Sequence, residues 1–294
     1  MGIAPSPIAA FGTTFQNPIL LASGTAGFGR EVAGVIALDA LGGLVTKAVS
    51  PEPRRGHPAP RVAEFDGGML NAVGLANPGL EAVCRTELPW LARHLSNARV
   101  IVNVVGAVAE DYVTVVRGLS AVPIVTAFEL NVSCPNTARG GEEFGADDAV
   151  LTDLVRRCRD ATSKPLITKL APTLPDIART AWAAGQAGAD GFTVVNTIPG
   201  TLSRWADGHR GPRLGYGQGG VSGPALLPVG VLATRRVRER TGKPVIGVGG
   251  IGTPEDVEQY LDAGAVLVAV GTAALADPRV PERLAASWSR RWRS

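Results

Sequence analysis

The sequence predicts an α/β fold, a (β/α)8 barrel whose long loops cover the face at the carboxyl ends of its strands. Two observations carry this prediction. Short β-rich segments and amphipathic helical segments alternate along the 294 residues, and the segments at 50–80 and 197–221 are far too long for ordinary βα loops. Alternation alone leaves closure undecided, so a doubly wound sheet stays open as the second architecture.

Eight short segments rich in Val, Ile, Leu and Ala have the composition of buried parallel strands. They are residues 18–23, 44–47, 100–105, 127–132, 165–170, 191–196, 244–248 and 265–270. Residues 147–161, 174–187 and 254–263 have the periodicity of amphipathic helices. Because no linker, charge block or low-complexity segment divides the chain, we expect a single domain over residues 1–294.

Composition excludes several classes of function. A net charge of +3 gives no footprint for nucleic acid, and 5% aromatic residues leave few platforms for base stacking. The longest uncharged apolar stretch, residues 263–276, is shorter than the ~20 residues of a membrane-spanning helix. Three scattered cysteines cannot build a disulfide framework. We therefore expect a cytoplasmic protein with no membrane or nucleic-acid partner.

Glycine-rich turns follow the seventh and eighth expected strands. Residues 247–252 match G-x-G-x-x-G, but no acid ends the next strand, so a Rossmann dinucleotide site is excluded. In a barrel these two loops commonly form a phosphate site, and they contain Gly249, Gly250, Gly271 and Thr272. Their backbone N–H groups could hold a phosphate with no side chain in the way. The alternative is that the glycines only make tight turns.

A cysteine and two lysines are expected at the same face of the barrel. Cys134 follows the fourth strand, and Pro135 prevents an immediate helix, which leaves the thiol on an irregular turn. Lys47 and Lys169 end the second and fifth strands, in a chain with only four lysines beside 25 arginines. A compact ammonium suits charge that develops at one atom of a cofactor. We expect the helical Cys84 and Cys158 to be small buried side chains.

Asparagines also gather at the expected strand ends. Of the eight in the chain, Asn103, Asn131 and Asn196 end strands, and Asn71 and Asn136 lie in adjacent loops. Carboxamides can pair with a ring that carries alternating N–H and C=O groups, so this pattern indicates recognition of such a ring. The three histidines have no metal-ligand spacing, and no pair of acids ends neighbouring strands.

Together these residues resemble the class 1 dihydroorotate dehydrogenases. The matching stretches are Asn17-Pro18, Ala22-Ser23-Gly24, Lys47, residues 69–79, 131–136 and 219–225, Asn196-Thr197 and the two glycine turns. The resemblance extends from residue 8 to 280. Cys134 stands where class 2 enzymes have serine, and the Gly-Met-Leu-Asn and Asn-Pro-Gly stretches are most similar to the NAD-linked 1B type.

The resemblance implies FMN-dependent oxidation of (S)-dihydroorotate to orotate in de novo pyrimidine biosynthesis. Cys134 would remove the C5 proton while a hydride leaves C6 for the flavin, and Lys169 would stabilise charge on the reduced flavin. The implied substrate contacts are Lys47, Asn71, Gly74, Leu75, Asn131, Asn136, Asn196 and Thr197. The implied FMN contacts are Ser23, Gly24, Lys47, Asn103, Asn131, Lys169, Val195, Ser222, Gly223, Gly249, Gly250, Gly271 and Thr272.

The 1B resemblance also implies partners. These are a second copy in a homodimer, or a heterotetramer with an electron-transfer subunit that carries FAD and a [2Fe–2S] cluster and passes electrons to NAD. Three dispersed cysteines cannot supply four thiolate ligands, so both groups would come from that subunit alone. Residues 199–217, with Trp205 and His209, have no residue-by-residue match to the family.

Three other interpretations stay open. A related flavin-dependent dihydropyrimidine oxidoreductase shares much of the flavin motif, but it typically has His where this chain has Asn136. A flavin-free barrel enzyme acting on a phosphorylated metabolite explains the glycines and leaves Cys134 and the asparagines without a role. A catalytically inactive binding subunit predicts no particular set of residues.

Overall fold

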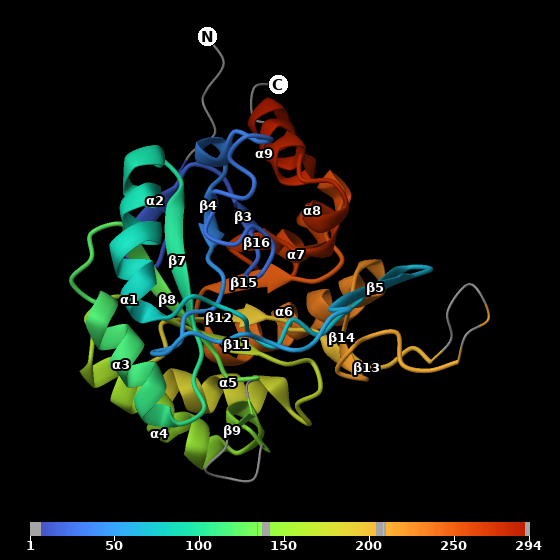
Figure 1. Ribbon diagram of the computed structural model, residues 1–294. Coiled ribbons are helices and arrows are strands. Elements are labelled where there is room, and N and C mark those ends of the chain that lie inside the picture. The colour runs from blue at the N-terminus through green and yellow to red at the C-terminus, as the bar shows by residue number, and fades with distance from the viewer. Residues whose placement is uncertain (1–6, 134, 137–141, 204–207, 209, 292–294) are drawn as a thin grey trace.

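The computed structural model describes residues 7–133, 135–136, 142–203, 208 and 210–291. Eight parallel strands form a closed barrel in the order β11-β12-β15-β16-β3-β4-β7-β8 (Figure 1). They are β3 (Ile19–Leu21), β4 (Gly43–Val45), β7 (Arg99–Val104), β8 (Val125–Asn131), β11 (Leu166–Leu170), β12 (Gly191–Val194), β15 (Val245–Val248) and β16 (Leu267–Val270). The eight expected strands are confirmed, and the pairing of Val268 with Ile19 closes the ring and excludes a doubly wound sheet.

Helices surround this barrel on its outer side (Figure 1). They are α1 (Leu80–Ala82), α2 (Leu88–His94), α3 (Ala109–Leu119), α4 (Asp148–Asp160), α5 (Ile177–Gln186), α6 (Leu227–Thr241), α7 (Pro254–Asp262), α8 (Thr272–Ala276) and α9 (Val280–Arg291). Asp147 caps α4 by accepting from two backbone N–H groups. Thr253 caps α7 by accepting from the backbone N–H of Asp256, and Pro254 is the first residue of that helix. The three expected amphipathic helices are therefore confirmed, as α4, α5 and α7. No helix of the described residues is long and apolar enough to cross a membrane.

Shorter helical turns interrupt the connections. They are the 3-10 turns η1 (Leu38–Ala40), η4 (Phe144–Ala146) and η5 (Pro224–Leu226), and the π-helical turn η2 (Val83–Glu87) between α1 and α2. A two-residue ribbon follows β8 and pairs β9 (Pro135–Asn136) with β10 (Glu142–Glu143).

An amino-terminal hairpin, β1 (Ile8–Ala10) and β2 (Thr13–Phe15), packs across the amino ends of the barrel strands. Phe11 and Phe15 belong to the same buried cluster as the inward residues of the strands. Phe11 lies so close to Gly191, the first residue of β12, that a Cβ there would be 2.5 Å from the phenyl ring. Since apolar side chains fill this end, a ligand site inside the barrel belongs at the carboxyl end.

The two long connections form a four-stranded antiparallel sheet, β13-β14-β6-β5, which lies beside the barrel (Figure 1). Its strands are β5 (Val62–Phe65), β6 (Gly68–Asn71), β13 (Ile198–Gly200) and β14 (Gly219–Ser222). The expectation of loops was wrong here, because Asn71 is the last residue of β6 and pairs with Gly220 of β14. The sheet joins segments that leave the barrel after β4 and after β12, so both connections are held over the same face.

Candidate active site

A buried polar network lies at the carboxyl end of the barrel. Strand register places Asn103 opposite Glu129 and Lys169 opposite Thr193. Glu129 Oε1 accepts a hydrogen bond from Asn103 Nδ2 at 2.7 Å, and its Oε2 accepts one from Thr193 Oγ1 at 2.7 Å. The Lys169 ammonium lies 3.9 Å from Glu129 Oε1, and all four residues are buried. Four neighbouring strands thus bring a charged pair and two neutral groups together.

Two groups of this network have unused hydrogen-bonding capacity. No described residue accepts a hydrogen bond from the Lys169 ammonium, and none donates one to the buried Asn103 Oδ1. Buried polar atoms are nearly always satisfied in folded proteins. A buried donor and a buried acceptor at the mouth of the barrel therefore indicate the place of a bound polar ligand.

The glycine turns meet beside this network. Gly249 and Gly250 have φ of 123° and 73°, which favours glycine at both positions. A Cβ at Gly250 would lie 2.7 Å from the backbone nitrogen of Leu227. Thr272 Oγ1 and Ser222 Oγ are 2.8 Å apart, so the turn after β16 is tied to the end of β14. The glycines therefore let the turn after β15 pack tightly against the start of α6, next to the turn after β16.

Two of the expected asparagines lie together. Asn196 Nδ2 donates to Asn131 Oδ1 at 3.4 Å, and Asn196 Oδ1 accepts from the backbone N–H of Thr197 at 2.9 Å. Thr197 packs so closely on Gly220 that a Cβ there would be 2.0 Å from its hydroxyl. Asn71 Nδ2 donates to the carbonyl of Gly220 at 3.2 Å. The side sheet therefore links Asn71 to the loop that carries Asn196 and Thr197.

The other predicted contacts lie on the loops around the mouth. Lys47 is half-buried two residues beyond β4, and its backbone N–H donates to Gly27. Leu75, with φ of 56°, packs against Ala48, the neighbour of Lys47. Ser23 Oγ donates to the carbonyl of Thr46 at 2.8 Å. Among the remaining positions, Gly24, Gly74 and Gly223 have positive φ, and Gly271 immediately precedes α8. The backbone N–H of Val195 donates to the carbonyl of Val248.

The predicted base, Cys134, lies outside the described residues, directly after Ser133. For Asn136 the backbone is described, in β9. The expectation that Cys84 is buried was wrong: it lies exposed in η2, where the irregular π-turn presents it to solvent. Cys158 is buried in α4 as expected, and burial raises the pKa of its thiol to about 12. Within the described ranges no cluster of three potential metal ligands occurs.

Glu129 and Thr193 belong to the network although the sequence interpretation assigned them no role. The available signal was a single acid in the otherwise uncharged strand Val125–Asn131. A charged residue in a buried strand requires a partner, because an isolated buried charge is strongly unfavourable. The rule therefore predicts that Glu129 has polar partners, but it does not predict which strands supply them.

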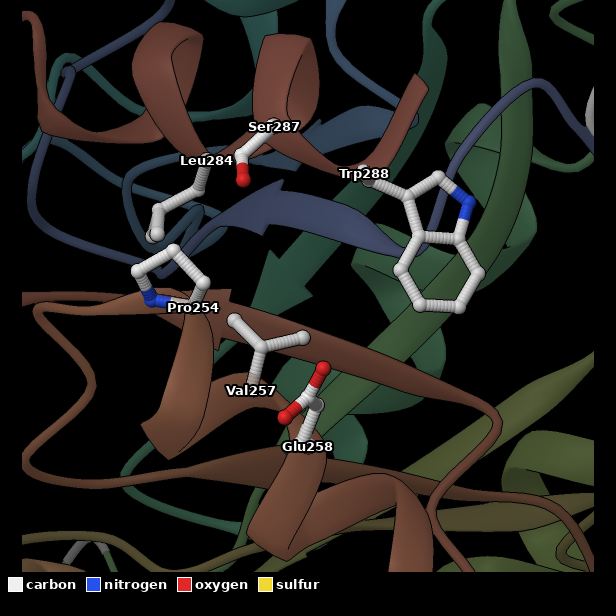
Figure 2. A pocket seen from close by; sticks show the side chains of 6 residues that line it. All are labelled: Pro254, Val257, Glu258, Leu284, Ser287 and Trp288. Atoms are coloured by element: carbon white, nitrogen blue, oxygen red, sulfur yellow. The ribbon is translucent and has the colours of Figure 1, made fainter. Parts of the chain in front are cut away.

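A separate pocket lies between α7 and α9, outside the barrel. Pro254, Val257 and Glu258 line it from one helix, and Leu284, Ser287 and Trp288 from the other (Figure 2). Its cavity volume is only about 10 Å³. That is below the ~300–1,000 Å³ typical of small-molecule sites, and none of the network residues lines it.

Comparison with known proteins gives consistent matches over this whole architecture. The family model described as dihydroorotate dehydrogenase matches residues 8–290, which include every barrel strand. Catalytic subunits named dihydroorotate dehydrogenase B (NAD(+)) from Bacillus thuringiensis (strain Al Hakam) and Bacillus cereus (strain AH187) are each 46% identical over 269 residues. The same holds for that of Bacillus anthracis (strain A0248). These alignments cover 92% of this chain and 86% of each relative.

Proposed function

The chain belongs to the dihydroorotate dehydrogenase family, and on that premise we propose that it is an FMN-dependent catalytic subunit oxidising (S)-dihydroorotate to orotate. The reaction belongs to de novo pyrimidine biosynthesis. The observation that carries the proposal is the buried network of Lys169, Glu129 and Asn103, which offers an unused donor and acceptor at the barrel mouth.

The described residues fit FMN at both of its ends. The backbone at Gly249, Gly250 and Gly271 suits a phosphate, because a barrel commonly binds phosphate in the loops after its last two strands. Lys169 and Asn103 suit the isoalloxazine ring, which carries acceptors and an N–H donor. When bound, FMN supplies a two-electron acceptor for the substrate hydride. The remaining proposed cofactor contacts are Ser23, Gly24, Lys47, Asn131, Val195, Ser222, Gly223 and Thr272.

Cys134 is the proposed general base. Its thiolate takes the proton from C5 of dihydroorotate, so that an S–H bond forms as the C5–H bond breaks. The electron pair released at C5 forms the C5=C6 double bond while the hydride departs from C6. The Lys169 ammonium stabilises the negative charge that reduction adds to the cofactor.

Carboxamides hold the substrate ring in this proposal. Asn131 and Asn196 lie within contact of each other, and Asn71 is tied to the same region through Gly220. Each amide offers both donors and an acceptor, as a ring with alternating N–H and C=O groups requires. Lys47 neutralises the substrate carboxylate. Gly74, Leu75, Asn136 and Thr197 complete the proposed substrate contacts.

We also propose the B-type organisation. The curated relatives are catalytic subunits of NAD-linked enzymes, and this chain has only three cysteines. A [2Fe–2S] cluster with four thiolate ligands therefore needs another polypeptide, which would also carry FAD. The proposed assembly is a homodimer of this chain that joins two such subunits in a heterotetramer, in the cytoplasm, where thiols stay reduced.

Anaerobic titration with dihydroorotate tests the proposed function. The purified chain, supplied with FMN, should be yellow and should lose its flavin absorbance as dihydroorotate is added, with orotate as the product. Dihydrouracil, which lacks the carboxylate, should leave the colour unchanged. A protein that stays colourless with added FMN would support the flavin-free barrel enzyme instead, and bleaching by dihydrouracil alone would support the dihydropyrimidine oxidoreductase.

A further inference from the structure

Glu129 is an unusual residue for the interior of a barrel. Among the residues that the structure describes, it is the one acid whose whole residue is buried, with 1% of its surface exposed. It stands in β8 between Phe128 and Leu130, both fully buried. Removing a carboxylate from water is costly unless hydrogen bonds and an opposite charge compensate, so its three partners define what this residue does.

Those partners come from three different strands and use both carboxylate oxygens. Asn103 of β7 and Thr193 of β12 donate hydrogen bonds of 2.7 Å, which fix the orientation of the carboxylate. Lys169 of β11 is different, because its ammonium lies 3.9 Å away. A charged N–H···O bond is ~2.7–2.9 Å, so this pair attracts electrostatically without using the hydrogen bonds of the ammonium.

Glu129 therefore holds the side chains of Lys169 and Asn103 in place while each keeps hydrogen-bonding capacity for a ligand. Lys169 keeps its donors, and Asn103, held by its Nδ2, keeps a buried Oδ1 with no partner among the described residues. Under the proposed function these are the donor and the acceptor that meet the flavin. A negative charge beside Lys169 also offsets part of the positive charge that favours a reduced flavin.

We propose that Glu129 is a positioning residue that orients Lys169 and Asn103 toward FMN and lowers the reduction potential of the bound flavin. The inference rests on the proposed function. In the proposed reaction Glu129 contacts no substrate atom, and it acts through Lys169 and Asn103.

Glu129→Gln separates charge from shape. The glutamine keeps the length of the side chain, and its Nε2 can donate to Asn103 Oδ1 once that amide rotates. With the carboxylate charge gone, the equilibrium constant for flavin reduction should rise on the order of tenfold, which is ~30 mV for a two-electron couple. FMN should bind several-fold more weakly, because the rotated amide no longer offers it Oδ1. Both are measured on the full chain, by dye-coupled redox titration and by fluorescence quenching of FMN.

Two variants control for charge and size. Glu81→Gln makes the same change of net charge at a side chain that is 87% exposed, and should leave the potential unchanged. Glu129→Asp keeps the charge in a shorter side chain, and should keep a near-wild-type potential while FMN affinity falls. A packing role alone would instead make the aspartate as damaging as the glutamine in both measurements.

The outcomes are distinct from those that test the function itself. A wild-type chain that binds no FMN, or whose FMN dihydroorotate cannot reduce, overturns the proposed function and this inference with it. A wild-type chain that passes both tests, with an unchanged potential in Glu129→Gln, overturns the inference alone. If Glu129→Gln does not fold because Lys169 loses its counter-charge, the substitution is compared in a Lys169→Gln background. The double variant should then have the higher potential, and equal potentials overturn the inference.

Discussion

At the scale of single residues, the cysteines differ in their surroundings. Cys158 is fully buried, and burial raises the pKa of its thiol to about 12. Cys84 is exposed, yet partial burial also raises the pKa of its thiol. Neither cysteine is therefore a thiolate near neutral pH. Only the thiolate form acts as a nucleophile or a base. The proposed proton transfer depends on Cys134 alone.

Cys134→Ser should slow single-turnover flavin reduction by ~10²–10⁴-fold at neutral pH, because a serine hydroxyl is a far weaker base than a thiolate. The measurement is stopped-flow absorbance after anaerobic mixing with dihydroorotate. Cys84→Ser serves as the matched control and should reduce its flavin at the wild-type rate. A wild-type rate in Cys134→Ser would exclude this residue as the base.

The surroundings of Asp39 shift its pKa in the opposite direction, and this shift affects the stability of the fold. Its carboxylate accepts hydrogen bonds from the backbone N–H groups of Ser96, Asn97 and Ala98 and from the Asn97 side chain. Burial alone would raise the pKa of Asp39, but these hydrogen bonds outweigh it and hold the pKa below its usual value. A depressed folded-state pKa contributes stability above the unfolded value, and this contribution is lost as the pH falls through the folded pKa.

Asp39→Asn should therefore lower the free energy of unfolding by about 1–2 kcal/mol at pH 7, where the carboxylate is charged. The difference from wild type should shrink as the pH falls below ~3.9, because the wild-type carboxyl protonates first in the unfolded chain and, at a lower pH, in the folded protein as well. Urea unfolding at both pH values checks this. Asp66→Asn, at an exposed residue, should change stability by less than ~0.5 kcal/mol at either pH. A loss in Asp39→Asn that does not depend on pH would contradict the electrostatic explanation.

At the scale of elements, the turn after β15 connects backbone conformation to cofactor binding. Gly250→Ala adds a Cβ at a φ of 73° and 2.7 Å from the backbone nitrogen of Leu227, so the turn must move. We expect FMN affinity to fall at least ~10-fold, because the backbone of this turn is the proposed phosphate site. Isothermal titration with FMN measures it.

Gly242→Ala is the matched control for that variant. Gly242 ends α6 with a φ of 64°, but no atom lies within 4 Å of its added Cβ. It should cost ~1–2 kcal/mol of stability through the left-handed backbone alone, and FMN affinity should stay at the wild-type value. Equal losses of FMN affinity in the two variants would mean that general destabilisation, not the turn, is responsible.

The elements also show what the sequence could and could not predict. Buried parallel strands are nearly continuous apolar runs, so local composition was enough for all eight barrel strands. The side sheet was missed because β13 and β14 are short and contain Gly and Pro, and β14 pairs with a strand about 150 residues earlier. Pairing at that distance leaves no local pattern. Glu129 was missed for the same reason, since its partners are on other strands. The role of Cys134 stays a prediction.

At the scale of the whole molecule, the proposed function requires a path by which electrons leave this chain. The isolated chain should oxidise dihydroorotate with artificial acceptors such as quinones or dyes, but it should not reduce NAD. Its glycine motif lacks the acid of a dinucleotide site, and three cysteines cannot ligate a four-thiolate cluster. Steady-state assays of the pure chain with each acceptor measure this. NAD reduction by the chain alone would refute the need for a partner subunit.

The amino-terminal hairpin, which closes one end of the barrel with Phe11 and Phe15, has a consequence for the folding of the chain during translation. Phe11 precedes Gly191, its contact in β12, by 180 residues, so this contact cannot form until long after Phe11 has been translated. At ~5–20 residues per second, the hairpin waits about 10–35 s for the strand that it covers. During that interval Phe11 lacks this part of its packing, although other members of its buried cluster, such as Leu20 and Val45, have already been translated. The hairpin can therefore cover β12 only after six of the eight barrel strands have been synthesised.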